Sequence, residues 1–129
     1  MYNIFRILAA SRSLQKLHFS SDNAWRDLLN EGRIKPVARD IRSSQSSLQQ
    51  VALEDFDRRA VLSLQLWSSF TQLRRIEIKA GRYAQYIPWS EVEEIIDQNL
   101  NLPNLHIQWE QHMACRTYSL NSDGVRSNR

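Results

Sequence analysis

The spacing of apolar residues along the chain predicts a mainly helical protein. Over residues 48–79 apolar side chains recur near the helical period of 3.6, so we expect one long helix there. The positions are Leu48, Val51, Ala52, Phe56, Ala60, Leu64, Trp67, Phe70 and Leu73. Between residues 61 and 67 the helix would be apolar on more than one side. We therefore expect it to form the spine of the fold or to enter a groove of a partner.

Four side chains of this expected helix are candidates for contact with a partner: Leu62, Leu66, Trp67 and Phe70. The same region also carries a strand pattern. Leu62, Leu64 and Leu66 alternate with polar or small residues, as do Ile76 and Ile78 further along. A short β-hairpin turning near Gly81 is the alternative interpretation.

Two shorter helices are expected nearer the C-terminus. The sequence Ser90-Glu91-Val92-Glu93 has the spacing of a capping box and predicts a helix over residues 90–98, with Val92, Ile95 and Ile96 facing inward. Residues 105–116 predict a last helix. A short strand over Leu105, Ile107 and Trp109 is the alternative.

These elements favour an all-α or mainly α fold, a small irregular helical bundle around one long helix. At 129 residues the chain has the length of one domain. We detect no internal repeat, which argues against a solenoid. No run of 18 apolar residues occurs, so an integral membrane span is not expected.

The distribution of charge separates the first 21 residues from the remainder. Residues 1–21 contain Arg6, Arg12 and Lys16 but no acid, whereas all 14 acidic residues follow. Without those three bases, 14 of the 17 basic residues remain and balance the 14 acids. An amphipathic, acid-free segment containing Arg and Ser is typical of a mitochondrial transit peptide, and an amphipathic first helix that stays on the protein is the alternative.

The expected domain organisation follows from this division. Residues 1–21 form the targeting segment or first helix, residues 22–117 a single helical domain, and residues 118–129 a disordered tail of Ser, Asn, Gly and Arg. The expected location is the mitochondrial matrix, with the cytoplasm or the nucleus as the alternative. The single cysteine, Cys115, cannot form an internal disulfide, which agrees with a reducing compartment.

The sequence offers no assembled catalytic or cofactor site. His106, His112 and Cys115 are too few for a structural zinc site, which needs four ligands, and no metal or other cofactor is expected. A phosphate-binding loop would need closely spaced glycines, but Gly32, Gly81 and Gly124 lie far apart. We therefore expect a protein that is not an enzyme.

The candidate contact surface is a stretch in which four bases and three aromatic residues are interleaved. Its members are Arg74, Arg75, Lys79, Arg82, Tyr83, Tyr86 and Trp89. Bases could hold phosphates while an aromatic ring stacks on a nucleobase, and the same side chains could contact an acidic protein groove. An exposed helix face with the rings turned into the core is the alternative.

Together these features predict a non-catalytic subunit, adaptor or assembly factor of a larger mitochondrial complex, such as the ribosome or the respiratory chain. Its partners would be proteins. A small RNA-binding protein that uses the basic and aromatic stretch is one alternative. Another is a cytosolic or nuclear accessory protein that docks an amphipathic helix on a partner complex.

Overall fold

The computed structural model describes residues 13–20, 39–41, 46–120 and 126–128. They form a six-stranded mixed sheet in which the strands are ordered as they occur in the chain. The strands are β1 (Lys16–Ser20), β2 (Gln50–Phe56), β3 (Arg75–Ala80), β4 (His106–Gln111), β5 (Ala114–Leu120) and β6 (Arg126–Asn128). The first four are parallel to one another, and β5 and β6 are antiparallel to their neighbours.

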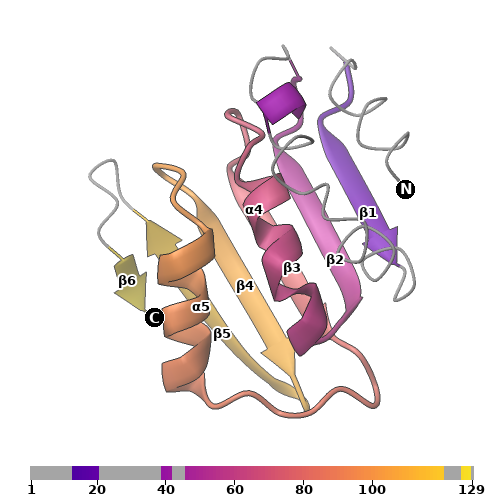
Figure 1. Ribbon diagram of the computed structural model, residues 1–129, viewed down its shortest axis with the longest axis vertical. Helices are drawn as coiled ribbons and strands as arrows, with labels where there is room; N and C mark the ends of the chain where they lie inside the picture. The colour runs from indigo at the N-terminus through magenta and orange to yellow at the C-terminus, as the bar shows by residue number, and fades with distance from the viewer. Residues whose placement is uncertain (1–12, 21–38, 42–45, 121–125, 129) are drawn as a thin grey trace.

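Three helical elements pack on one face of this sheet (Figure 1). The 3-10 helix η1 (Arg58–Ser63) continues into α4 (Leu64–Trp67), and α5 (Trp89–Asn99) follows β3. The mainly helical fold expected from the sequence is therefore wrong. Residues 48–79 do not form one long helix, because they contain two strands, β2 and β3, joined by η1 and α4.

The strands form because their apolar residues alternate. Val51 and Leu53 in β2, like Ile76 and Ile78 in β3, are buried beneath the helices. The residues between them are polar or small and point to the other face of the sheet. Leu48, three residues before Val51, is also buried, and this spacing produced the misleading helical period.

A local pattern recurs where the first three parallel strands begin. Each of the first three strands is preceded by a leucine placed three residues before its first inward-facing position: Leu14, Leu48 and Leu73. The backbone repeats as well. The carbonyl of Gln15 accepts hydrogen bonds from the N–H groups of residues 49 and 50, and the carbonyl of Gln49 accepts from those of residues 74 and 75.

The expected hairpin near Gly81 is also corrected. Gly81 follows β3, whose two neighbours are both parallel to it. The hairpin instead joins β4 to β5 through a two-residue turn, His112 and Met113, in the region where a last helix was expected. The alternative strand over residues 105–109 is confirmed in β4, where Ile107 and Trp109 are buried.

The helix expected over residues 90–98 is confirmed as α5, with Val92, Ile95 and Ile96 buried. It begins one residue earlier, with Pro88 as the N-cap residue and no side-chain capping bond, so the capping role expected of Ser90 is absent. The boundary expected between residues 117 and 118 falls inside β5. Residues 1–12, to which most of the targeting segment belongs, lie outside the described residues.

Candidate functional site

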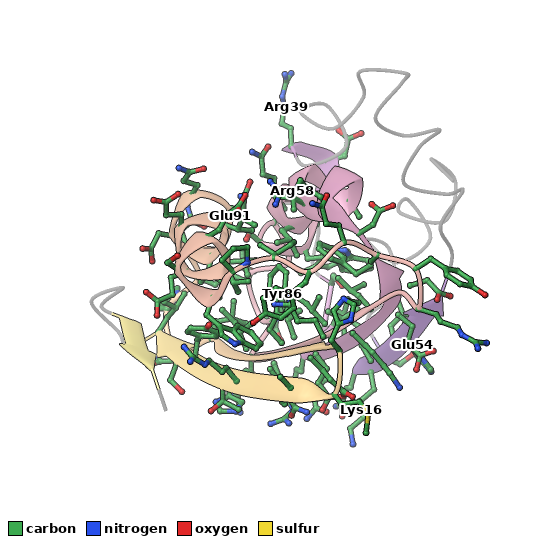
Figure 2. The ribbon with its side chains drawn as sticks, turned by 90° about the horizontal axis from the view of Figure 1, so that it is seen from below. Lys16, Arg39, Glu54, Arg58, Tyr86 and Glu91 are labelled. Carbon is green, nitrogen blue, oxygen red and sulfur yellow. The ribbon has the colours of Figure 1, made fainter. Side chains whose placement is uncertain are left out.

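Two connections meet at the end of the sheet where the parallel strands β3 and β4 finish, and we call this end the carboxyl edge of the sheet. Residues 81–88 lead from β3 to α5, and the turn at residues 112–113 leads from β4 to β5. Figure 2 looks onto this edge, and Tyr86 lies near its centre. In open α/β sheets, side chains that bind ligands commonly lie at the carboxyl ends of the strands.

A buried glutamine holds the two connections together. The side-chain oxygen of Gln111 accepts a hydrogen bond from the Ile87 N–H at 2.9 Å, and its nitrogen donates to the Ile87 carbonyl at 2.6 Å. Gln111 is only 2% exposed. The N–H and the carbonyl of Ile87 are thus both hydrogen-bonded, as they would be if a neighbouring strand paired with them. These two bonds fix the path of residues 81–88 beside β4.

Aromatic rings pack together beside this glutamine. The ring of Tyr86 meets that of Trp89 edge to face at 6.2 Å between centroids and that of His112 at 5.6 Å. The Nε2 atom of His112 lies 3.2 Å from the carbonyl oxygen of Ala84. Ring contacts and a polar contact therefore connect the turn at residues 112–113 to the loop at residues 81–88.

Two guanidinium groups lie over aromatic rings at the same edge. That of Arg116 stands 5.0 Å from the centre of the Trp89 ring, and that of Arg82 stands 5.7 Å from the centre of the Tyr83 ring. Both distances are within the range of a cation–π attraction. We call the set of Arg82, Tyr83, Tyr86, Trp89, His112, Met113 and Arg116 the aromatic edge.

The large hydrophobic side chains that are exposed in the described residues all belong to the aromatic edge. Tyr83 is 91% exposed, Tyr86 41% and Met113 100%. A single exposed apolar residue is ordinary, but several in one place mark a contact surface.

The turn that carries Met113 has an unfavourable backbone. The φ angles of His112 and Met113 are 49° and 64°. A two-residue hairpin turn needs positive φ at both positions and for that reason favours Asn-Gly. Each side chain that adopts this conformation costs about 1 kcal/mol. Asn and Gly would therefore form this turn at a lower cost in free energy than His112 and Met113.

The structure divides the basic and aromatic stretch expected from the sequence. Arg82, Tyr83, Tyr86 and Trp89 all lie at the aromatic edge, where Arg82 contacts Tyr83 and Tyr86 contacts Trp89. Arg74 and Arg75 lie at the opposite end of β3, where the Arg75 side chain donates to Glu77 at 3.0 Å and to Gln108 at 2.9 Å.

Lys79 alternates with the buried Ile78 and so points to the uncovered face of the sheet. The apolar residues expected to face a partner are core residues of this chain. Leu66, Trp67 and Phe70 are each at most 1% exposed, and the side chain of Leu62 lies outside the described residues.

Sequence reasoning missed His112, Met113 and Arg116 as members of a site. It assigned residues 105–116 to a helix, in which these side chains would not form a turn next to Tyr86. The strand alternation over residues 105–109 was the signal that could have placed them, because a strand ending at Gln111 puts the following residues at the edge of the sheet.

The uncovered face of the sheet is polar. A shallow depression of about 480 Å³ lies over β1, β2 and β3, above the small side chain of Ala52. Both acids on its rim are already paired, since His18 lies 3.1 Å from Glu54 and Arg75 bonds Glu77, and Lys16 is the other charged residue of the lining. The depression therefore offers little unsatisfied charge to a ligand.

The possible metal ligands do not gather. His106 Nδ1 contacts the Ser119 hydroxyl at 3.1 Å, whereas His112 contacts Ala84 and Cys115 is exposed on β5. Within the described residues no three histidine, cysteine or acidic side chains are placed to hold one metal ion.

Comparison of the chain with protein-family models, with curated proteins and with solved structures finds no match. In the part of the chain that the structure describes, none of the helices has the length and apolar character needed to cross a membrane.

Proposed function

We propose that the chain is a non-catalytic subunit or adaptor that binds a protein partner through the aromatic edge. The observation that carries this proposal is the gathering of Tyr83, Tyr86 and Met113, the exposed large hydrophobic residues of the described chain, at one edge of the sheet. Tyr, Trp, Met and Arg are the residue types enriched in the centres of protein interfaces.

The cost of the turn supports the same proposal. Met113 is fully exposed and has a positive φ, so neither its side chain nor its backbone helps the fold. Strained backbone that persists in a protein commonly belongs to a functional site. A partner that covers the Met113 side chain supplies the contact that the chain itself does not.

The charges near the aromatic edge favour a protein over a nucleic acid. Besides the ion pair of Arg58 with Glu91, three bases lie at the carboxyl end of the sheet: Lys79, Arg82 and Arg116. Four further acids lie at the same end: Glu54, Asp55, Asp57 and Glu110. Binding of a nucleic acid depends mainly on bases that neutralise phosphates, and this balance supplies no positive field. Mixed charge around an apolar centre is typical of a protein interface.

The loop at residues 81–88 and the turn at residues 112–113 are also held in place before a partner binds. Gln111 fixes Ile87, and the ring contacts of Tyr86 fix the turn at residues 112–113. A surface that is already ordered loses less conformational entropy on association.

Site-specific photo-crosslinking tests the proposal. A photoreactive amino acid replaces Met113 in the full chain, and in a matched variant it replaces Asn104. Asn104 is likewise exposed with positive φ, at 60°, but lies before β4 at the opposite edge of the sheet. In cells, the Met113 position should yield a discrete protein adduct that disappears when Tyr83→Ser is added, and the Asn104 position should not. Identical adducts from both positions, or an adduct indifferent to Tyr83→Ser, would contradict the proposal.

We further propose a mitochondrial location for this function, on the charge distribution of residues 1–21 alone. β1 uses Lys16–Ser20 and pairs with β2, so removal of all 21 residues would also remove a strand of the sheet. Any cleavage compatible with the described fold lies before Leu14, which packs against the core.

A further inference from the structure

The aromatic edge carries two positive groups whose preferred partners are missing from the described chain. We propose that its occupant is a short extended segment of a partner protein in which an acidic residue stands next to an apolar one. This inference rests on the proposed function and names the chemistry of the partner.

The arginines of the aromatic edge differ from the paired arginines elsewhere. Arg58 forms a two-bond ion pair with Glu91, and Arg75 is paired with Glu77. Among the described residues, the guanidinium groups of Arg82 and Arg116 contact no carboxylate; each contacts an aromatic ring.

The ring contacts leave these guanidinium groups ready to bind a carboxylate. A cation–π attraction uses none of the N–H groups of a guanidinium in a bond to an acceptor atom. Those N–H groups match the two oxygens of a carboxylate and can bond both at once. The attraction also restricts the motion of the side chain, which lowers the entropy lost on binding.

Apolar side chains flank both arginines. Tyr83 follows Arg82 in the chain, and the ring of Tyr86 contacts both Trp89, beneath Arg116, and His112, beside Met113. Met113 is flexible and fully exposed, so it can adapt to the side chain of a partner. An acidic residue adjacent to an apolar one would engage an arginine and the apolar group together.

The neighbouring acids restrict the alternatives. Asp55 lies near the end of β2, Asp57 follows that strand, and Glu110 lies near the end of β4. A strongly basic segment would be attracted by these acids but repelled by both arginines. A nucleic acid carries a phosphate at every nucleotide and would meet these acids as well as the arginines, whereas a segment with one carboxylate can meet an arginine alone.

Defined peptides test this inference. Three pools of fluorescein-labelled nonapeptides carry a central Asp-Leu, Gln-Leu or Lys-Leu pair in otherwise identical Gly, Ser and Pro mixtures. Fluorescence anisotropy with the full chain should show the Asp-Leu pool binding at least tenfold more tightly than the Lys-Leu pool. A labelled oligouridine should bind more weakly than the Asp-Leu pool at the same ionic strength.

Three variants assign the preference to the aromatic edge. Arg82→Glu with Arg116→Glu should reverse the order of the pools, and Arg82→Gln with Arg116→Gln should abolish the preference with less risk to folding. Arg74→Glu is the matched control, because Arg74 is exposed at the opposite edge of the sheet and should leave the order unchanged. Thermal unfolding of each variant confirms that it is folded.

The outcomes separate this inference from the proposed function. If the three pools bind equally and Tyr83→Ser abolishes this binding, the inference of an acidic segment is wrong, but the proposal that the aromatic edge binds a protein is supported. Binding of no pool, together with identical crosslinks from Met113 and Asn104, would overturn both. Tighter binding of oligouridine than of any peptide, lost in the Arg82→Glu, Arg116→Glu variant, would replace the protein partner with RNA.

Discussion

The side-chain amide of Gln111 forms both hydrogen bonds of the Ile87 backbone, accepting at 2.9 Å and donating at 2.6 Å. Through this pair the last residue of β4 fixes the loop that carries Tyr83 and Tyr86. A single buried polar side chain therefore connects the core of the protein to its aromatic edge.

Gln111→Leu should lower the free energy of unfolding by about 2–4 kcal/mol, because it leaves the buried N–H and carbonyl of Ile87 without partners. Urea unfolding measures the change. The control is Gln108→Leu, at a half-buried position on the uncovered face, where the side chain accepts a hydrogen bond from the Arg75 side chain rather than from the backbone. A Gln111→Leu variant as stable as the unaltered chain would show that the pair does not hold the loop.

Met113→Gly should raise the free energy of unfolding by about 1 kcal/mol, since glycine adopts a φ of 64° without strain. It should at the same time weaken binding of the partner, because the exposed side chain is lost. Thermal unfolding and crosslinking measure the two effects. Asn104→Gly provides the comparison: asparagine tolerates positive φ, so a smaller gain is expected. A loss of stability in Met113→Gly would contradict the account of the turn.

Deletion of residues 1–21 should destabilise the fold by several kcal/mol and promote aggregation. It removes β1, exposes the edge of β2, and deletes Leu14 and Leu17 from the core. The hydroxyl of Ser47, which donates to the Leu14 carbonyl at 3.0 Å, would lose its acceptor. Circular dichroism and sedimentation follow the change, with deletion of residues 1–12 as the control. If both deletions behave alike, β1 does not contribute to the stability of the sheet.

A reporter fused to residues 1–25 should enter mitochondria if the bases and missing acids of residues 1–21 act as a targeting signal. The matched control replaces Arg6 and Arg12 with Glu and should remain in the cytosol. Sequencing of the N-terminus of the native protein should then find a start no later than residue 14. Diffuse signal from the unaltered fusion would remove the mitochondrial proposal without affecting the aromatic edge.

The sequence predicted the elements whose signals are local. α5 was predicted from the spacing of a capping box and from three apolar residues at helical spacing, all within residues 90–96. The alternation of Ile76 and Ile78, and that of Ile107 and Trp109, indicated β3 and β4, though only as alternatives.

The helical interpretation failed because two periods share the same residues. The spacing of three between Leu48 and Val51 fits a helix, and the spacing of two between Val51 and Leu53 fits a strand. Choosing between these periods depends on neighbours distant in sequence: β2 forms because β1 and β3 pair with it on either side. Such long-range pairing leaves little trace in a single sequence.

The sequence predicted only part of the aromatic edge, because some of its contacts join residues that are distant in sequence. Arg82, Tyr83, Tyr86 and Trp89 are close in sequence and stay together, whereas Arg116 joins Trp89 only because β5 returns beside β4. Arg74 and Arg75 were included because bases and aromatic residues are interleaved from residue 74 to residue 89 of the sequence. In a strand they lie at the far end.

Binding of the partner by a double variant tests the central claim most directly. Tyr83→Ser with Met113→Ser removes two exposed side chains that contribute little to the core, so unfolding should change by less than about 1 kcal/mol. The control, Gln72→Ser with Arg74→Ser, alters two exposed residues at the opposite edge. For the protein recovered through the Met113 crosslink, titration calorimetry should show an affinity about 10–100-fold weaker for the first variant and unchanged for the second. Equal affinities for the two folded variants would contradict the assignment of the aromatic edge as the binding surface.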